Sequence, residues 1–207
     1  MTARGRPPLV SNAAILDAAL TSFANLGYDA TSVRAINAEL GLSHETITQR
    51  FGTKAELFRA AVRHGIQQFV NVFDSEVDSN LPTDDLERLQ AVVRAFIIAA
   101  SRHTNLGELL HQRALPASDR AELMNSIGLD ARIIEVTDLL ARLRRESIIG
   151  DVSTRELWFL VQAGAAPLNF PELASMFDPV DGSLDPSRHV DRMVEIIMRA
   201  LGVRADR

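Results

Sequence analysis

The order of apolar and polar residues along the chain predicts helices. Apolar residues recur three and four positions apart over most of the 207 residues, as they do on one face of an α-helix, and no stretch alternates as a strand would. Nine helices are predicted, at about residues 12–26, 33–40, 44–51, 54–80, 86–100, 106–115, 118–150, 153–166 and 187–201. Residues 178–186 are expected to form a loop. The prediction is therefore an all-α fold.

Residues 31–54 are the most informative stretch. Thr31 or Ser32 can cap a helix whose apolar positions are three and four residues apart. Gly41 interrupts that pattern and allows a sharp turn, because glycine adopts positive φ without a Cβ clash. Ser43 is predicted to cap a further helix, with Ile47 and Phe51 on one face. Two short helices joined by a tight turn are typical of a helix-turn-helix motif.

The second helix of this motif leaves a row of polar side chains without a role in the core. They are His44, Glu45, Thr46, Thr48, Gln49 and Arg50. Such groups can contact base edges or phosphates. Arg50 could bind guanine through two hydrogen bonds or neutralise a phosphate, and Glu45 could accept from a cytosine amino group or favour the helix dipole. The sequence leaves both choices open.

The residues of this stretch resemble a known family. The resemblance is carried by Gly27-Tyr28, Thr31-Ser32-Val33, Ile36, Leu42-Ser43, Thr46-Ile47, Phe51, Thr53-Lys54 and Leu57. Together they are similar to the N-terminal domain of the TetR (tetracycline-repressor-like) regulators, from about Ile15 to Phe58. Two positions depart from that pattern: the family usually has tyrosine in place of Thr48 and a small residue in place of Asn37.

The resemblance implies a function and its partners. It implies a homodimeric repressor that pairs through the eighth and ninth predicted helices, binds a palindromic operator in double-stranded DNA and is released by a small molecule. Lys54 is expected to hold a phosphate. The predicted DNA-contacting residues are Arg4, Arg6, Thr31, Ser32, Ser43, His44, Glu45, Thr46, Thr48, Gln49, Arg50 and Lys54.

Three domains are expected. Residues 1–10 would form a flexible basic arm, whose Arg4 and Arg6 could lie in a minor groove or simply in solvent. Residues 11–65 would form the helix-turn-helix head, and residues 66–207 a larger helical domain for ligand binding and dimerisation. The long fourth helix is predicted to join the two. Dimerisation is expected to use two apolar faces, one on each helix: Leu157, Leu160, Val161 and Leu168 on the eighth, and Met193, Ile197 and Leu201 on the ninth.

The expected ligand is a mostly apolar small molecule held by one or two hydrogen bonds. The candidate residues combine large apolar side chains with a few polar anchors. They are Phe73, Phe96, His103, Leu110, His111, Arg113, Phe159 and Gln162.

The amino-acid composition excludes several kinds of site and classes of protein. The chain has no cysteine, which excludes disulfides, zinc–thiolate sites and a thiol nucleophile. The net charge is +2 for residues 1–65 and −7 for the rest, as suits a protein that binds DNA by one end. No catalytic motif, cofactor, metal ligand set or membrane span is recognised, so a cytoplasmic non-enzyme is expected. The alternative is a helical small-molecule-binding protein or enzyme whose N-terminal motif does not serve sequence-specific DNA binding.

Overall fold

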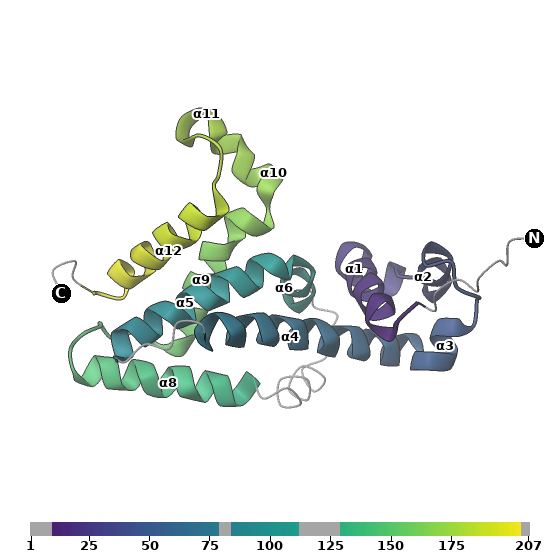
Figure 1. Cartoon of the computed structure of the whole chain (residues 1–207), viewed down its shortest axis with the longest axis horizontal. Coiled ribbons are helices and arrows are strands. Elements are labelled where there is room, and N and C mark those ends of the chain that lie inside the picture. Colours follow the sequence, from purple (N-terminus) through teal and green to yellow (C-terminus); the bar gives the residue numbers. More distant parts are fainter. Residues whose placement is uncertain (1–9, 79–83, 112–128, 204–207) are drawn as a thin grey trace, which may run out of the picture. The chain divides into compact units, whose positions relative to one another are not determined.

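The computed structural model describes residues 10–78, 84–111 and 129–203, and every regular element in these ranges is a helix (Figure 1). The all-α prediction is confirmed there. The chain divides into two compact units, which are described separately. The head unit consists of residues 1–67 and 105–123, and the body unit of residues 68–104 and 124–207.

The head unit contains α1 (Asn12–Ala30), α2 (Val33–Glu39), α3 (Thr46–Phe51), the first part of α4 (Lys54–Asp78) and most of α6 (Thr104–His111). Each helix buries the apolar face that its periodicity predicts. Ile15 and Phe23 of α1, Ile36 of α2 and Ile47 of α3 are almost completely buried. The rings of Phe23 and Tyr28 on α1 stack with centroids 5.9 Å apart, and Phe58 of α4 meets both edge to face at 4.9 and 5.1 Å, which joins α1 to α4.

The assignment of α6 to the head unit differs from the predicted domain of residues 66–207. Leu106 and Leu109 of this helix are buried. The Asn105 side-chain amide donates to the Thr21 hydroxyl over 2.9 Å, a contact between residues 84 positions apart. Periodicity reports which face of a helix is apolar but not which unit covers it. The head is therefore built from two separate parts of the chain.

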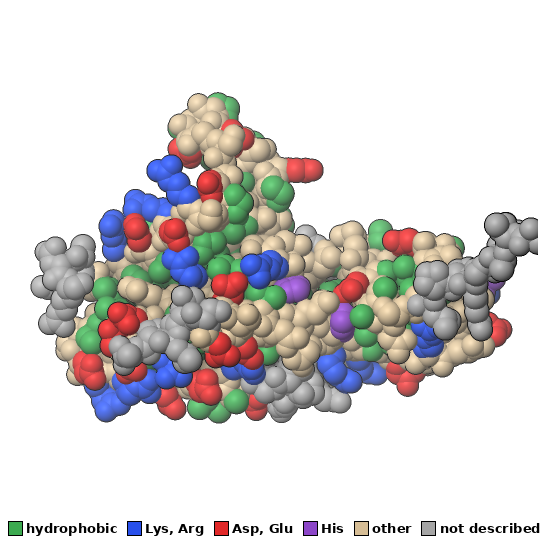
Figure 2. All heavy atoms as spheres, viewed as in Figure 1, with side chains coloured by type: hydrophobic (Ala, Val, Ile, Leu, Met, Phe, Trp, Pro, Cys, Tyr) green, Lys and Arg blue, Asp and Glu red, His purple; other side chains and the backbone are tan. Residues whose placement is uncertain are grey.

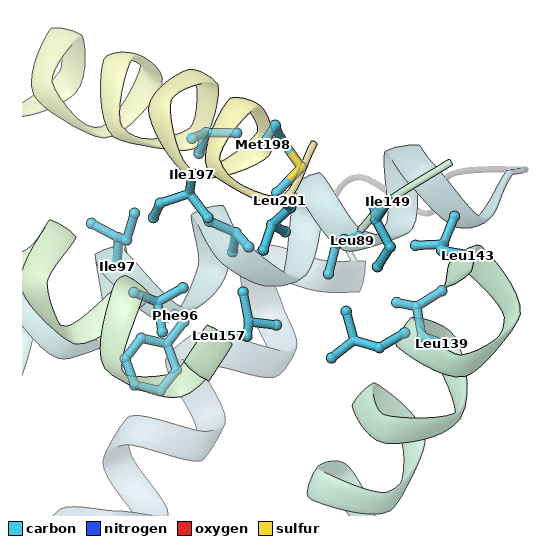
Figure 3. Close-up of a cluster of buried hydrophobic side chains, with 14 of the residues drawn as sticks. Leu89, Phe96, Ile97, Leu139, Leu143, Ile149, Leu157, Ile197, Met198 and Leu201 are labelled. Carbon is cyan, nitrogen blue, oxygen red and sulfur yellow. The ribbon is translucent and has the colours of Figure 1, made fainter. Parts of the chain in front are cut away.

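The body unit is a stack of helices around α5 (Asp85–Arg102). The second part of α4, α8 (Leu129–Arg145), α9 (Thr154–Asn169) and α12 (Pro186–Ala200) pack around it, and α10 (Pro171–Ala174), the 3₁₀ turn Ser175–Phe177 and α11 (Asp178–Asp181) connect α9 to α12 (Figure 1). In Figure 3, Ile97 of α5, Leu157 of α9, Ile197 of α12 and Leu143 of α8 belong to one buried cluster.

Two segments of the body unit differ from prediction: the end of α8 and the connection at residues 178–186. The seventh predicted helix was expected to reach about residue 150, whereas α8 ends at Arg145; its predicted first part falls partly outside the described residues. Ser147 adopts φ 56°, and the Ile148 N–H donates to the Leu143 carbonyl over 3.0 Å, which closes α8 as a glycine usually would. The expected loop at 178–186 instead contains α11, where proline in the first turn and Asp178 favour one helical turn.

Part of the surface predicted for dimerisation lies in the core instead. Leu157 and Val161 of α9, Ile197 of α12 and Leu201 just after it are each at most 4% exposed because they form the core of the body unit. Leu160, Leu168 and Met193 are half-buried beside the same core, and pairing through these two helices stays a prediction. The large apolar residues that remain exposed on these two helices are Phe159 and Ile196. A sequence shows that a helix has two apolar faces but not which one its own unit buries.

None of the helices in the described ranges combines the length and the apolar character needed to cross a lipid bilayer.

Gly65 provides a test of the packing in the head unit. A Cβ built at Gly65 on α4 would lie 2.7 Å from Leu20 Cδ2 of α1 and 3.6 Å from Leu106 Cδ1 of α6. We expect Gly65→Leu to lower the free energy of unfolding by about 1–3 kcal/mol, the usual cost of overpacking. The matched control is Gly107→Ala on α6, where a Cβ meets no atom within 4 Å. Urea titrations of both variants measure the difference, and equal stability would contradict this close packing.

Candidate nucleic-acid interface

The turn between α2 and α3 is closed by backbone hydrogen bonds. Gly41 adopts φ +64°, and the Leu42 N–H donates to the Asn37 carbonyl over 2.8 Å. Glycine suits this position because left-handed backbone costs it no Cβ clash. Ile47 is fully buried at the start of α3 and fixes that helix against the rest of the head unit. The predicted helix-turn-helix is present at residues 33–51.

Asn37 holds α3 in place, and sequence reasoning missed it. Its side chain is completely buried. The amide Nδ2 donates to the His44 carbonyl over 3.1 Å, and the Oδ1 accepts from the Ile47 N–H over 3.3 Å. The second bond satisfies one of the free N–H groups that every helix start exposes. The departure from the family pattern at this position was the available signal.

The start of α3 differs from the prediction. Ser43 was expected to cap the helix, but α3 begins at Thr46. Its N-cap residue Glu45 makes no side-chain capping bond, and Asn37 of α2 supplies the capping acceptor instead. The Ser43 hydroxyl instead lies 2.7 Å from the Thr46 hydroxyl. The cap therefore comes from a residue ten positions away in the sequence.

The outer side of the turn and of α3 is a continuous polar surface. Ser43, His44, Glu45, Thr48, Gln49 and Arg50 are all exposed, and Thr46 is half-buried. The Gln49 amide donates to the Glu45 carboxylate over 3.2 Å. The structure thus brings together the seven residues predicted on α3 and the turn before it. We call this set the α3 surface.

Arg50 and Lys54 lie near the end of α3 and the beginning of α4, and both side chains are held by α1 or the residues beside it. The Arg50 guanidinium donates to the Val10 carbonyl over 2.7 Å. The Lys54 ammonium donates to the Asp29 carbonyl over 3.1 Å and lies 4.8 Å from the centroid of the Tyr28 ring. These contacts position the cation of Arg50 within the α3 surface and that of Lys54 beside it.

A sharp corner separates α3 from α4. Gly52 adopts φ +79°, and a Cβ there would lie 2.3 Å from the Glu56 carboxylate. That carboxylate accepts from the Thr53 N–H over 2.7 Å, while the Thr53 hydroxyl accepts from the Glu56 N–H over 3.3 Å, which forms a capping box. The Thr53 backbone N–H and hydroxyl lower the pKa of Glu56. This cap therefore stabilises α4 above the usual carboxyl pKa and weakens as the pH falls through the lowered value.

Thr31 and Ser32, which were also predicted to contact DNA, stand apart from the α3 surface. Thr31 is 3% exposed, and its hydroxyl lies 2.7 Å from the Gly27 carbonyl, so the assignment of Thr31 to DNA contact was wrong and its role is structural. Ser32 is exposed, and its hydroxyl accepts from the Ala35 N–H to cap α2. Arg4 and Arg6 lie outside the described residues.

The body unit contains an apolar cavity of about 70 Å³. Phe69 and Phe73 of α4, Phe96 of α5 and Trp158 of α9 supply its aromatic wall, and the Phe96 and Trp158 rings meet edge to face with centroids 4.9 Å apart. Of the predicted ligand residues, Phe73 and Phe96 line this cavity.

Three other residues predicted to bind the ligand, Phe159, His103 and Gln162, do not line this cavity. Phe159 is 61% exposed on the side of α9 opposite the core. The side chains of Leu110 and His111, and the whole of Arg113, lie outside the described residues. Val136 was missed as a lining residue, because its spacing alone gives the same signal as plain core.

A second, charged hollow of about 460 Å³ shares Phe73, Val92, Arg132 and Val136 with the apolar cavity. Arg132 donates from Nε to Asp74 over 3.0 Å and also pairs through Nη2, and hydrogen bonding to Asp74 raises the pKa of Arg132. The Arg132–Asp74 ion pair therefore lies where the apolar cavity meets the charged hollow.

Comparison with known proteins agrees with the geometry of the head. The family model for bacterial regulatory proteins of the tetR family matches residues 15–61. A protein named HTH-type transcriptional repressor Rv3405c, from Mycobacterium tuberculosis, is 31% identical over 105 residues, which cover 47% of this chain and 56% of that protein. An HTH-type transcriptional regulator of Mycobacterium bovis matches to the same extent. The chain thus spans about half the length of the curated relatives it matches.

Solved structures extend the likeness in fold to nearly the whole chain. The TetR family regulator PfmR from Thermus thermophilus is 18% identical with a TM-score of 0.62, covering 93% of this chain and 96% of that one. A regulatory protein in the tetR family from Rhodococcus is 20% identical with a TM-score of 0.66, covering 94% and 100%. The resemblance noted in the sequence is confirmed for residues 15–61, which match the model of the tetR family of bacterial regulatory proteins.

Proposed function

We propose that this protein is a DNA-binding transcriptional regulator that acts as a homodimeric repressor. The observation that carries the proposal is the α3 surface: a row of exposed polar side chains on a short helix, backed by the buried Ile47 and Asn37. Such a helix can enter a major groove and present donors and acceptors to base edges, while Arg50 and Lys54 neutralise phosphates. A palindromic operator suits a two-fold dimer whose heads are ~34–36 Å apart, one helical turn of DNA.

The proposed regulation is release by a small molecule bound in the body unit. The apolar cavity of about 70 Å³ is small for a drug-sized ligand, since such sites usually measure ~300–1,000 Å³. The neighbouring charged hollow of about 460 Å³ supplies the missing space. We infer an amphipathic ligand, with its apolar part between Phe96 and Trp158 and its polar part beside the Arg132–Asp74 ion pair.

The DNA assignment predicts a change in salt dependence. Arg50→Ala and Lys54→Ala should each weaken binding to an operator fragment from the protein's own promoter region. Each should lower the slope of log affinity against log salt by about one unit, if one phosphate contact is lost. The control is Arg63→Ala, which removes the same charge from an exposed position on α4. Fluorescence anisotropy at several salt concentrations measures both quantities. Unchanged affinity and slope in both variants would contradict the assignment.

Asn37 gives a test of how α3 is positioned. Asn37→Ala leaves the Ile47 N–H and the His44 carbonyl without their partner, which should cost about 1–3 kcal/mol of stability. Operator affinity should fall as well, even at temperatures where the variant is folded. Asn37→Asp keeps an acceptor for Ile47 but buries a carboxylate against the His44 carbonyl, so we expect it to be at least as unstable as Asn37→Ala. Wild-type stability and affinity in Asn37→Ala would refute the positioning role.

The ligand assignment is tested by filling the cavity. Val136 lines both the apolar cavity and the charged hollow, so Val136→Phe should occupy space that the ligand needs. Amphipathic compounds that raise the wild-type melting temperature and release operator DNA should do neither with this variant, while its operator affinity without ligand stays unchanged. Thermal shift and anisotropy measure these effects. An unaltered ligand response in Val136→Phe would place the site elsewhere.

A further inference from the structure

A hollow lies between the end of α9 and the segment that connects this helix to α12. The connecting segment, residues 170–185, turns back through α10, the 3₁₀ turn and α11, and the space beside it measures about 390 Å³. That volume falls within the ~300–1,000 Å³ of small-molecule sites. None of its wall residues lines the apolar cavity or the charged hollow described above. We call this separate space the α11 hollow.

The wall of the α11 hollow is mostly apolar, and much of it faces solvent. Its larger apolar members are Pro167, Phe170, Leu173, Phe177 and Leu184. Phe170 is 47% exposed, and Leu173 and Phe177 are each 59% exposed. A group of large apolar side chains left in water on one surface marks a place where another molecule binds. The wall therefore suits a ligand with an apolar body.

The charge around the hollow is negative. Residues 163–187 contain four carboxylates and no lysine or arginine. Asp185 is occupied in capping α12. Asp178 and Asp181 line the hollow, and the side chain of neither forms a hydrogen bond or ion pair within the described ranges. In Figure 2 the segment at the top of the view carries red and green side chains, while blue side chains gather over α12. Two carboxylates beside an apolar wall favour a cation.

Pro167 adds a hydrogen-bond acceptor to this wall. Proline has no N–H, so it cannot donate to the carbonyl of Ala163, four residues earlier on α9. Both residues line the hollow. The next carbonyl, that of Gly164, lies 2.9 Å from His189 Nε2, which ties α12 to α9 at the wall. A ligand with an N–H group can supply the donor that the Ala163 carbonyl lacks.

We propose that the α11 hollow binds a primary amine, as its ammonium ion, that carries an apolar body. The ammonium group pairs with Asp178 or Asp181 and donates to the Ala163 carbonyl, while the body covers Phe170 and Phe177. The aromatic rings add to the attraction, because their faces attract cations. An anion of the same shape would be repelled by the two carboxylates. The inference goes beyond the regulatory ligand proposed above and does not depend on it.

Neutralising the two carboxylates tests the charge of the site. In isothermal titration calorimetry of the full-length protein with 4-phenylbutylamine, Asp178→Asn combined with Asp181→Asn should weaken binding roughly fivefold or more. The matched control, Asp130→Asn combined with Glu146→Gln, removes two exposed carboxylates on and just after α8 and should bind as wild type does. Equal affinity of wild type and the Asp178/Asp181 variant would overturn the proposal.

A series of probes with one body and three head groups tests the class of ligand. It uses the Val136→Phe protein, so that the apolar cavity is filled. The amine should bind roughly tenfold more tightly than 4-phenylbutanol, and 4-phenylbutyrate should bind more weakly still. Phe177→Leu, added to the same protein, should weaken the amine roughly 2–5-fold and leave the alcohol unchanged. A carboxylate that binds as tightly as the amine would overturn the proposal.

The position of the site is tested against the apolar cavity. Trp158 is the only tryptophan in the sequence and lines that cavity, so the amine should leave its fluorescence unchanged. Val136→Phe should bind the amine as tightly as wild type does. Loss of amine binding in Val136→Phe would move the amine to the cavity and overturn this inference while the regulatory proposal stands. Amine binding that survives in Val136→Phe supports the α11 hollow, whatever the outcome for the regulatory ligand.

Discussion

The body unit depends on the burial of α5 on nearly all sides. Seven of its residues are buried, among them the consecutive Ala95, Phe96 and Ile97, which point in different directions around the helix. Residues 91–100 of this helix are apolar except for Arg94, and such a stretch is stable only when other helices surround it. Four helices surround it: α4, α8, α9 and α12. Each of them buries one face against α5 or against a neighbouring helix. What these helices can offer to ligands, DNA or another copy is limited to the faces that remain.

In the head unit, polar groups help to hold the short helix α3 in position. Six residues are too few for α3 to be stable alone, so its position has to come from outside the helix. Ile47 supplies the apolar anchor and Asn37 the hydrogen bonds, both on the inner side. The outer side is then free of any duty in folding. This division allows residues such as Thr48 and Gln49 to change without loss of the fold.

Local signals in the sequence predicted much of this architecture. Helical spacing located the helices, and Ser11, Ser32 and Ser153 cap the ones that they precede. The errors came from interactions between distant residues. The start of α3 depends on Asn37, the end of α8 on a left-handed serine, and the assignment of Leu157 and Ile197 to the core on how two amphipathic helices rotate against α5. The order of apolar and polar residues alone does not show where such helices end or which of their faces is buried. The α3 surface was predictable because its residues are exposed and close in sequence.

The contribution of α6 to the head has a consequence for how the protein is made. Leu106 packs beside Gly65, and Asn105 bonds to Thr21, so the core of the head includes residues that follow the first helices by some 40 to 80 positions. On the ribosome, α1 to α4 emerge first, with the surface that α6 will cover still open to solvent. The head can complete its core only after α5 has also left the exit tunnel. A gene fragment that stops at residue 67 would encode a head whose core is incomplete. Its exposed apolar side chains would favour aggregation with other nascent chains.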